Sequence, residues 1–161
     1  MAMVDMFLKI DTVKGESKDS KHAGEIDILE FSFGVAQQGV AHTGGGSGAG
    51  KAHWDDMIIT KRADKSSPTL MLRCATGQHF KDATLTVRKA GGKQEEYYQV
   101  KLYEVLISNF SNSGNGDDSI PVEHVSLNYS KIEFAYKEQS KDGGLGSPVK
   151  VSWDIKTNQG G

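Results

Sequence analysis

The sequence predicts an all-β fold: a β-barrel of two curved antiparallel sheets, with one short α-helix at the side and a long extended hairpin loop. Three observations support it. Apolar and polar residues alternate with a period of two through most of the chain, as in half-buried strands. Glycine supplies 19 of the 161 residues, which favours a turn-rich chain. Only one segment places apolar residues at helical spacing.

Length and composition predict a single domain spanning residues 1–161. The net charge of −2 argues against a nucleic-acid-binding protein, because such domains are usually basic. The lone cysteine, Cys74, excludes an intramolecular disulfide and fits a reducing compartment. The N-terminus lacks the pattern of a secretory signal peptide, and no apolar run is long enough for a membrane-spanning helix. We therefore expect no membrane insertion.

The first half of the chain predicts strands at residues 3–10 and 25–37, joined by a polar loop. In the second strand the apolar residues change parity between Ile28 and Leu29, which indicates a β-bulge or a sharp bend. Beyond that point Phe31 and Phe33 would point inward. The opposite face carries small or polar residues, so it would meet water or a ligand; the candidates are Glu30, Ser32 and Gly34.

A glycine-rich tract follows, and a further strand is predicted at residues 53–62. Two interpretations of the tract compete: a phosphate-binding loop, or an arm that grips another subunit. The tract matches most of the P-loop pattern, but Ala52 stands where a magnesium-binding hydroxyl is needed, and a strand is expected where the helix should begin. An arm without packing residues loses much conformational entropy unless it docks. We therefore expect it to contact another subunit or ring through His42, Thr43, Gly44, Gly45, Gly46, Ser47, Gly48, Ala49, Gly50, Lys51 and His53.

The one predicted helix starts at Ser66-Ser67-Pro68, which offers an N-cap serine followed by proline at the first helical position, and Gly77 is placed to end it. Its apolar side would carry Leu70, Met71, Cys74 and Ala75. Strands are predicted again at residues 80–89, 95–108, 122–137 and 149–155. A second change of parity within residues 122–137 indicates another bulge or corner, and the last five residues are expected to fray.

Catalytic or metal-binding residues are not predicted. The five histidines do not form a ligand cluster with each other or with the cysteine, and a tetrahedral zinc site needs three or four ligands. Cys74 falls on the apolar side of the short helix, where packing is the simpler role. Adjacent acidic residues in strands point to opposite faces. We therefore expect neither an enzyme nor a cofactor.

The chain resembles the Hcp (haemolysin-coregulated protein) family, whose members are the tube subunits of bacterial type VI secretion systems. The resemblance is nearly full length and colinear. It rests on VDMFLKID near the start, HAGEIDILEFSFG from His22, HTGGGSGAGK from His42, DKSSPTLMLRCATGQHF from Asp64, and the segments LTVRKAGG and EYYQVKLYEVLISN.

The resemblance implies a β-barrel protomer that forms homohexameric rings, which stack into a tube like that of a phage tail. A contractile sheath and a VgrG-type spike would be partners, and small effectors would be held in the lumen. The protein would reside in the bacterial cytoplasm and then be secreted by the type VI system. Bacterial competition and virulence are the associated processes.

Two alternatives from other classes stay open beside the tube subunit. One is a free-standing secreted effector or surface-binding β-barrel protein. The other is a nucleotide-binding enzyme, which the failed P-loop context disfavours. The mass of the particle in solution separates the first two, and a nucleotide-induced thermal shift would test the third.

Overall fold

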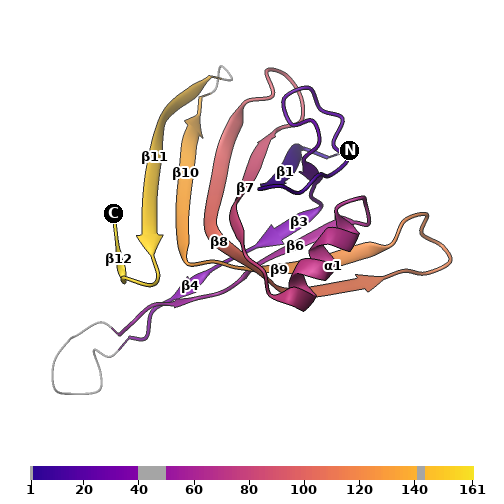
Figure 1. Cartoon of the computed structure of the whole chain (residues 1–161). Helices are drawn as coiled ribbons and strands as arrows, with labels where there is room; N and C mark the ends of the chain where they lie inside the picture. The colour runs from indigo at the N-terminus through magenta and orange to yellow at the C-terminus, as the bar shows by residue number, and fades with distance from the viewer. Residues whose placement is uncertain (1, 40–49, 141–143) are drawn as a thin grey trace.

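The computed structural model describes residues 2–39, 50–140 and 144–161. As predicted, it is built mainly of strands with one short helix (Figure 1). The elements are β1 (Val4–Ile10), β2 (Ile26–Asp27), β3 (Glu30–Ser32), β4 (Val35–Ala36), β5 (His53–Trp54), β6 (Met57–Arg62), α1 (Ser67–Thr76), β7 (Phe80–Lys89), β8 (Glu96–Ser113), β9 (Val122–Asn128), β10 (Lys131–Gln139), β11 (Leu145–Asp154) and β12 (Gln159–Gly160).

All strands except β4 and β5, which pair with each other, form two curved antiparallel sheets that share β8. The larger sheet has the order β12-β11-β10-β8-β7-β1-β2, and the smaller has the order β3-β6-β9-β8. In Figure 1 the smaller sheet passes beneath the curved wall made by the larger one. Among the described residues, the larger sheet ends at β12 and does not close onto the smaller sheet. We call β10, β11 and β12 the flap. Ile132 of β10 is buried in the core, whereas Val149 and Val151 of β11 are exposed.

Three sharp changes of direction let the chain pass between the sheets. β2 pairs with β1, whereas β3 pairs with β6, so the chain turns at Ile28 and Leu29 as their parity change predicted. A corner at Tyr129–Ser130 divides the predicted strand 122–137 into β9 and β10. The third bend lies in β8, which pairs with β7 and β10 up to Val105 and with β9 from Leu106 onward.

The bend in β8 lies next to an unusual backbone conformation. Glu104 has φ 51°, a left-handed conformation that side chains rarely adopt. Its carboxylate also pairs with Lys156 at 2.5 Å, on the surface. The left-handed residue redirects the strand, so that its two halves contribute to different sheets.

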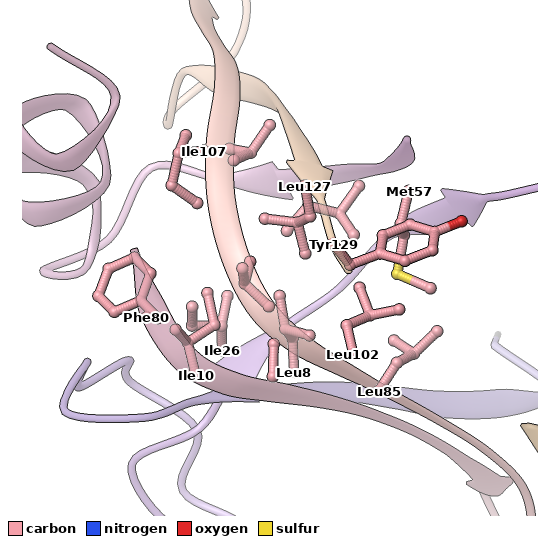
Figure 2. Packing of buried hydrophobic residues seen from close by; sticks show 14 of the residues in the cluster. Leu8, Ile10, Ile26, Met57, Phe80, Leu85, Leu102, Ile107, Leu127 and Tyr129 are labelled. Carbon is pink, nitrogen blue, oxygen red and sulfur yellow. The ribbon is translucent and has the colours of Figure 1, made fainter. Parts of the chain in front are cut away.

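The core fills the space between the two sheets. Figure 2 shows apolar side chains from both sheets pointing toward one another. The largest members are almost completely buried; they include Leu8, Ile26, Met57, Leu85, Leu102, Ile107 and Leu127. Full burial of each such side chain contributes roughly 1.5–3 kcal/mol, so this cluster dominates the stabilising energy.

A buried polar network attaches α1 to the smaller sheet. Lys61 on β6 and Glu123 on β9 are fully buried, and their charged groups lie 2.6 Å apart. The Ser67 hydroxyl at the start of α1 donates to the same Glu123 oxygen at 2.7 Å. Asn112 donates to the other Glu123 oxygen at 2.8 Å. The network is well satisfied, and it fixes the beginning of the helix.

The helix itself differs from the prediction in two respects. The N-cap is Ser66, so the helix begins at Ser67, one residue before the proline, and the Ser66 hydroxyl donates to Asp64 instead of capping the helix. Gly77 does end the helix in a left-handed conformation, with φ 70°. Only Leu70 of the predicted apolar side is fully buried, and Cys74 is half-buried.

The C-terminal segment is paired, which contradicts the expectation that it frays. β12 pairs with Trp153 and Asp154 of β11, and Gly161 exchanges two backbone hydrogen bonds with Ser152. A Cβ atom at Gly160 would lie 2.1 Å from the Ser152 carbonyl oxygen, so only glycine fits there. Glycine at this position lets β12 approach the β11 backbone closely and pair with its end.

An ion-pair cluster secures the loop between β1 and β2. The buried Arg88 guanidinium donates to Asp19 at 2.5 and 3.0 Å and to Asp5 at 3.2 and 3.3 Å. Hydrogen bonds from Arg88, and from the backbone of Lys21 and His22, lower the pKa of Asp19 from 3.8 to about 2. In turn, the hydrogen bonds with Asp19 are the main cause that raises the pKa of Arg88.

Our first prediction concerns the backbone at Glu104. Replacing it with valine places a β-branched side chain in a left-handed conformation, and we expect a loss of about 1–2 kcal/mol in the free energy of unfolding. Glu104→Gly also removes the ion pair with Lys156 but tolerates the backbone. Urea denaturation should therefore give a lower midpoint for Glu104→Val than for Glu104→Gly. Equal midpoints would show that this conformation is not needed for the bend.

The second prediction is a pH dependence that arises from Asp19. Its pKa is depressed in the folded state, so its stabilising effect is complete above about pH 4 and is lost as pH falls toward about 2. The melting temperature of the wild type should exceed that of Asp19→Asn near neutral pH. This difference should shrink across that acidic window. A difference that is constant from pH 7 to pH 2 would contradict the prediction, and Asp117→Asn in an exposed loop is the matched control.

Candidate functional site

Most of the predicted subunit-contact tract lies outside the described residues. This applies to His42, Thr43, Gly44, Gly45, Gly46, Ser47, Gly48 and Ala49. The structure does place the two flanks of the tract. Val35 pairs with Trp54 and Ala36 with His53, so β4 and β5 form a short antiparallel ribbon. Lys51 and His53 are exposed and Gly50 is half-buried, and the contact role of all these residues stays a prediction.

The predicted polar face exists on β3. Glu30 and Ser32 are exposed, whereas Phe31 between them is half-buried and packs against the core. Ser32 lies opposite Ile58 on β6, which lies opposite Ser126 on β9, which lies opposite Asn109 on β8. The next row contains Glu30, Thr60, His124 and Ser111. The small sheet therefore presents a mainly polar surface of short side chains across all four strands.

Ser32 lines a shallow hollow on this face. The hollow has a volume of about 620 Å³, and Ile58, Ser126 and Asn128 also line it. Asp56 is present at its side, but its carboxylate already accepts hydrogen bonds from Ser108 at 2.6 Å and from Asn128 at 2.9 Å. The surface is therefore suited to non-covalent contact with another polar surface.

Gly34, the third residue assigned to this face, follows β3, and a Cβ atom there would lie 3.2 Å from the Asp55 carboxylate at the edge of the hollow. Its role stays a prediction. Gly34 also lines an adjoining apolar cleft of about 500 Å³ between the β4–β5 ribbon and the flap. The walls of the cleft come from both ends of the chain and include Phe33, Val35, Trp54, Phe134, Val151 and Trp153. We define these residues, together with Gly34, as the flap cleft.

Polar contacts hold the margin of the flap cleft in place. The Asp55 backbone nitrogen donates to the Gly34 carbonyl at 2.9 Å, and the Tyr129 hydroxyl donates to the Asp55 carbonyl at 2.7 Å. Burial is the main cause that raises the pKa of Tyr129 to about 12, so the hydroxyl keeps its proton. Trp54 Nε1 is buried and has no hydrogen-bond partner among the described residues.

Sequence reasoning missed the flap cleft. Alternation of apolar and polar residues does not distinguish a strand whose apolar face is buried in the core from one whose apolar face is exposed on the surface. Val149 and Val151 alternate as a core strand would, yet they are 69% and 55% exposed. The signal available in the sequence was the clustering of aromatic residues near both ends of the chain. It does not reveal that these segments meet in space.

The chemistry that the sequence disfavoured receives no support from the geometry. Lys51 is followed by β5 and β6, as predicted, and not by the helix of a P-loop. Within residues 2–39, 50–140 and 144–161, no three histidine, cysteine or carboxylate side chains converge as metal ligands do. In the same ranges, no helix has the length and apolar character needed to span a bilayer.

An all-β fold with a polar sheet face and an apolar cleft does not by itself define a function. Comparison with known proteins is more specific. The family model described as "Type VI secretion system effector, Hcp" matches residues 7–136. The chain is 49% identical over 157 residues to protein Hcp1 of Pseudomonas aeruginosa, covering 96% of this chain and 97% of that protein.

Solved structures agree with the sequence comparison. One described as a type six secretion system protein superposes with a TM-score of 0.93 at 28% identity, covering 99% of this chain and 100% of the other. Hcp1 from Salmonella typhimurium gives a TM-score of 0.81 at 29% identity, with 99% of each chain covered. The chain therefore belongs to the Hcp family of the type VI secretion system, a family of secreted structural proteins and not of enzymes.

Proposed function

We propose that this protein is the tube subunit of a type VI secretion system. Its protomers form a homohexameric ring, and rings stack into a hollow tube that a contractile sheath expels. The proposal is carried by the polar face of the smaller sheet, where Glu30 and Ser32 are exposed in front of an apolar core. Such a face, backed by a packed core, is suited to line a water-filled channel.

The polar face would then line the lumen and contact the cargo. Short side chains such as Ser32, Ser126 and Ser111 keep the channel wide and offer hydroxyl groups to many different partners. Small effectors held in this way, a VgrG-type spike and the sheath are the proposed partners. The protein would wait in the bacterial cytoplasm and be secreted when the system fires.

The glycine tract, residues 42–53, is proposed to contact a neighbouring subunit or ring. Its support is the β4–β5 ribbon, whose two paired strands flank the tract on either side in the sequence. A free-standing secreted effector is the competing function. It would use the same β fold as a monomer and would not require the polar face to line a channel.

The mass of the particle in solution tests the proposed function. Size-exclusion chromatography with light scattering should give six times the 17.5 kDa chain mass. A monomer across the micromolar range would contradict the ring and favour the free-standing effector.

Ser32→Gln tests the lumen assignment separately. The longer side chain should reduce the amount of effector that co-purifies with rings from the native cells, because it obstructs the short-side-chain surface. The mass of the ring itself should not change. Undiminished effector recovery from Ser32→Gln rings would show that Ser32 does not line the cargo-binding surface. Ser119→Gln, in the exposed loop between β8 and β9, is the matched control.

A further inference from the structure

Two exposed side chains of α1 form an apolar projection on the surface. Met71 is 57% exposed and Leu72 is 59% exposed, whereas the neighbouring Leu70 is completely buried. The orientation of the helix is fixed, because Ser67 is bound to the buried Lys61–Glu123 pair and Leu70 is inserted into the core. We call Met71 and Leu72 the helix knob.

The flap cleft is the complementary apolar surface of the same chain. Its rim is open to solvent at Val35 and Val151, which are 52% and 55% exposed. The lining is almost wholly apolar and contains two tryptophans, Trp54 and Trp153. Exposed apolar surface of this kind usually marks a site that a partner covers.

The helix knob and the flap cleft lie at opposite edges of the molecule. α1 packs against β8, which is one edge strand of the smaller sheet. Phe33, Gly34 and Val35 follow β3, which is the other edge strand. Figure 1 shows the same arrangement, with α1 on one side of the barrel and the β4 end and the flap on the other. Neither surface can therefore cover the other within one chain.

Charge also favours a match between the two surfaces. The only charged side chain in α1 is Arg73, in its last turn, and the first turn contains no acidic residue. Beside Trp54 at the margin of the cleft are Asp55, whose side chain is 64% exposed, and Asp56. A cationic helix end would thus approach an acidic margin, a pairing that favours the correct orientation on encounter.

We propose that the helix knob of one copy docks in the flap cleft of a second copy. This inference rests on the proposed ring and specifies its subunit contact. Because two different surfaces meet, the contact is heterologous, and its repetition around an axis generates a ring when the rotation closes. Docking would place the β8 edge of one small sheet beside the β3 edge of the next. The polar faces would then follow one another around the channel.

Cross-linking with a short bismaleimide tests the contact directly. In a Cys74→Ser background, Leu72→Cys and Val151→Cys are prepared separately and mixed. Covalent dimers should form in the mixture and not in either variant alone. A chain carrying both substitutions should give a ladder of multimers. Ser119→Cys mixed with Val151→Cys is the control and should not cross-link.

Assembly of the full chain provides a second readout. Leu72→Asp should weaken each contact at least about tenfold, because it places a charge where the contact would bury the leucine side chain. Light scattering should then show smaller particles. The conservative Leu72→Met should retain the wild-type mass. Circular dichroism checks that both variants are folded.

The outcomes separate this inference from the proposed function. A sixfold mass without cross-linking in the mixture would overturn the docking and leave the ring standing. Dimers formed by Val151→Cys alone would mean that two like surfaces meet, which also overturns it. A wild type that remains monomeric would overturn both proposals. Mixture-specific cross-links together with loss of assembly in Leu72→Asp would support both.

Discussion

The bend in β8 is the constraint on which the rest of this fold depends. One strand pairs with β7 and β10 and then with β9, so the two sheets cannot separate without breaking it. Glu104 adopts a left-handed conformation beside the point of change. On the other side, the turn at Ile28 and Leu29 passes the chain between the sheets, with backbone bonds to Met6 and Thr60. The two sheets that enclose the core are thereby joined covalently on both sides, by the β8 bend and by the turn at residues 28–29.

Alternation of apolar residues predicts much of this architecture because burial on one face has a strict period of two. It predicted the bends at residues 28–29 and 129–132, where the buried parity changes. The same signal occurs in β8, where Val100 and Leu102 are buried on one parity and Val105 and Ile107 on the other. The prediction of a single strand at residues 95–108 overlooked this bend. The pairing of Gly160 was not predictable, because it depends on a close approach to Ser152 in β11.

The candidate site divides in the same way. Ser32 and Glu30 could be assigned from the sequence because their exposure follows from the inward direction of Phe31. The flap cleft could not be assigned, because its walls come from segments about a hundred residues apart that meet only after folding. The helix was misjudged for a related reason: helical spacing predicted that Met71 would be buried with Leu70, yet it is 57% exposed. A pattern of apolar residues shows which surfaces avoid water but not whether the covering partner is the same chain.

The buried Lys61–Glu123 pair contributes to keeping an apolar surface of α1 exposed. Burying two charges requires desolvation that their mutual attraction often only offsets, so such a pair is weak evidence for stability alone. Here both Lys61 and Glu123 contact the Ser67 hydroxyl, which fixes how α1 begins. An apolar helix held only by the buried Leu70 could rotate to cover more of its own surface. A directional polar anchor opposes that rotation and keeps Met71 and Leu72 outward. In this view the buried pair serves the orientation of a contact surface, and the stability of the protomer rests on the core behind it.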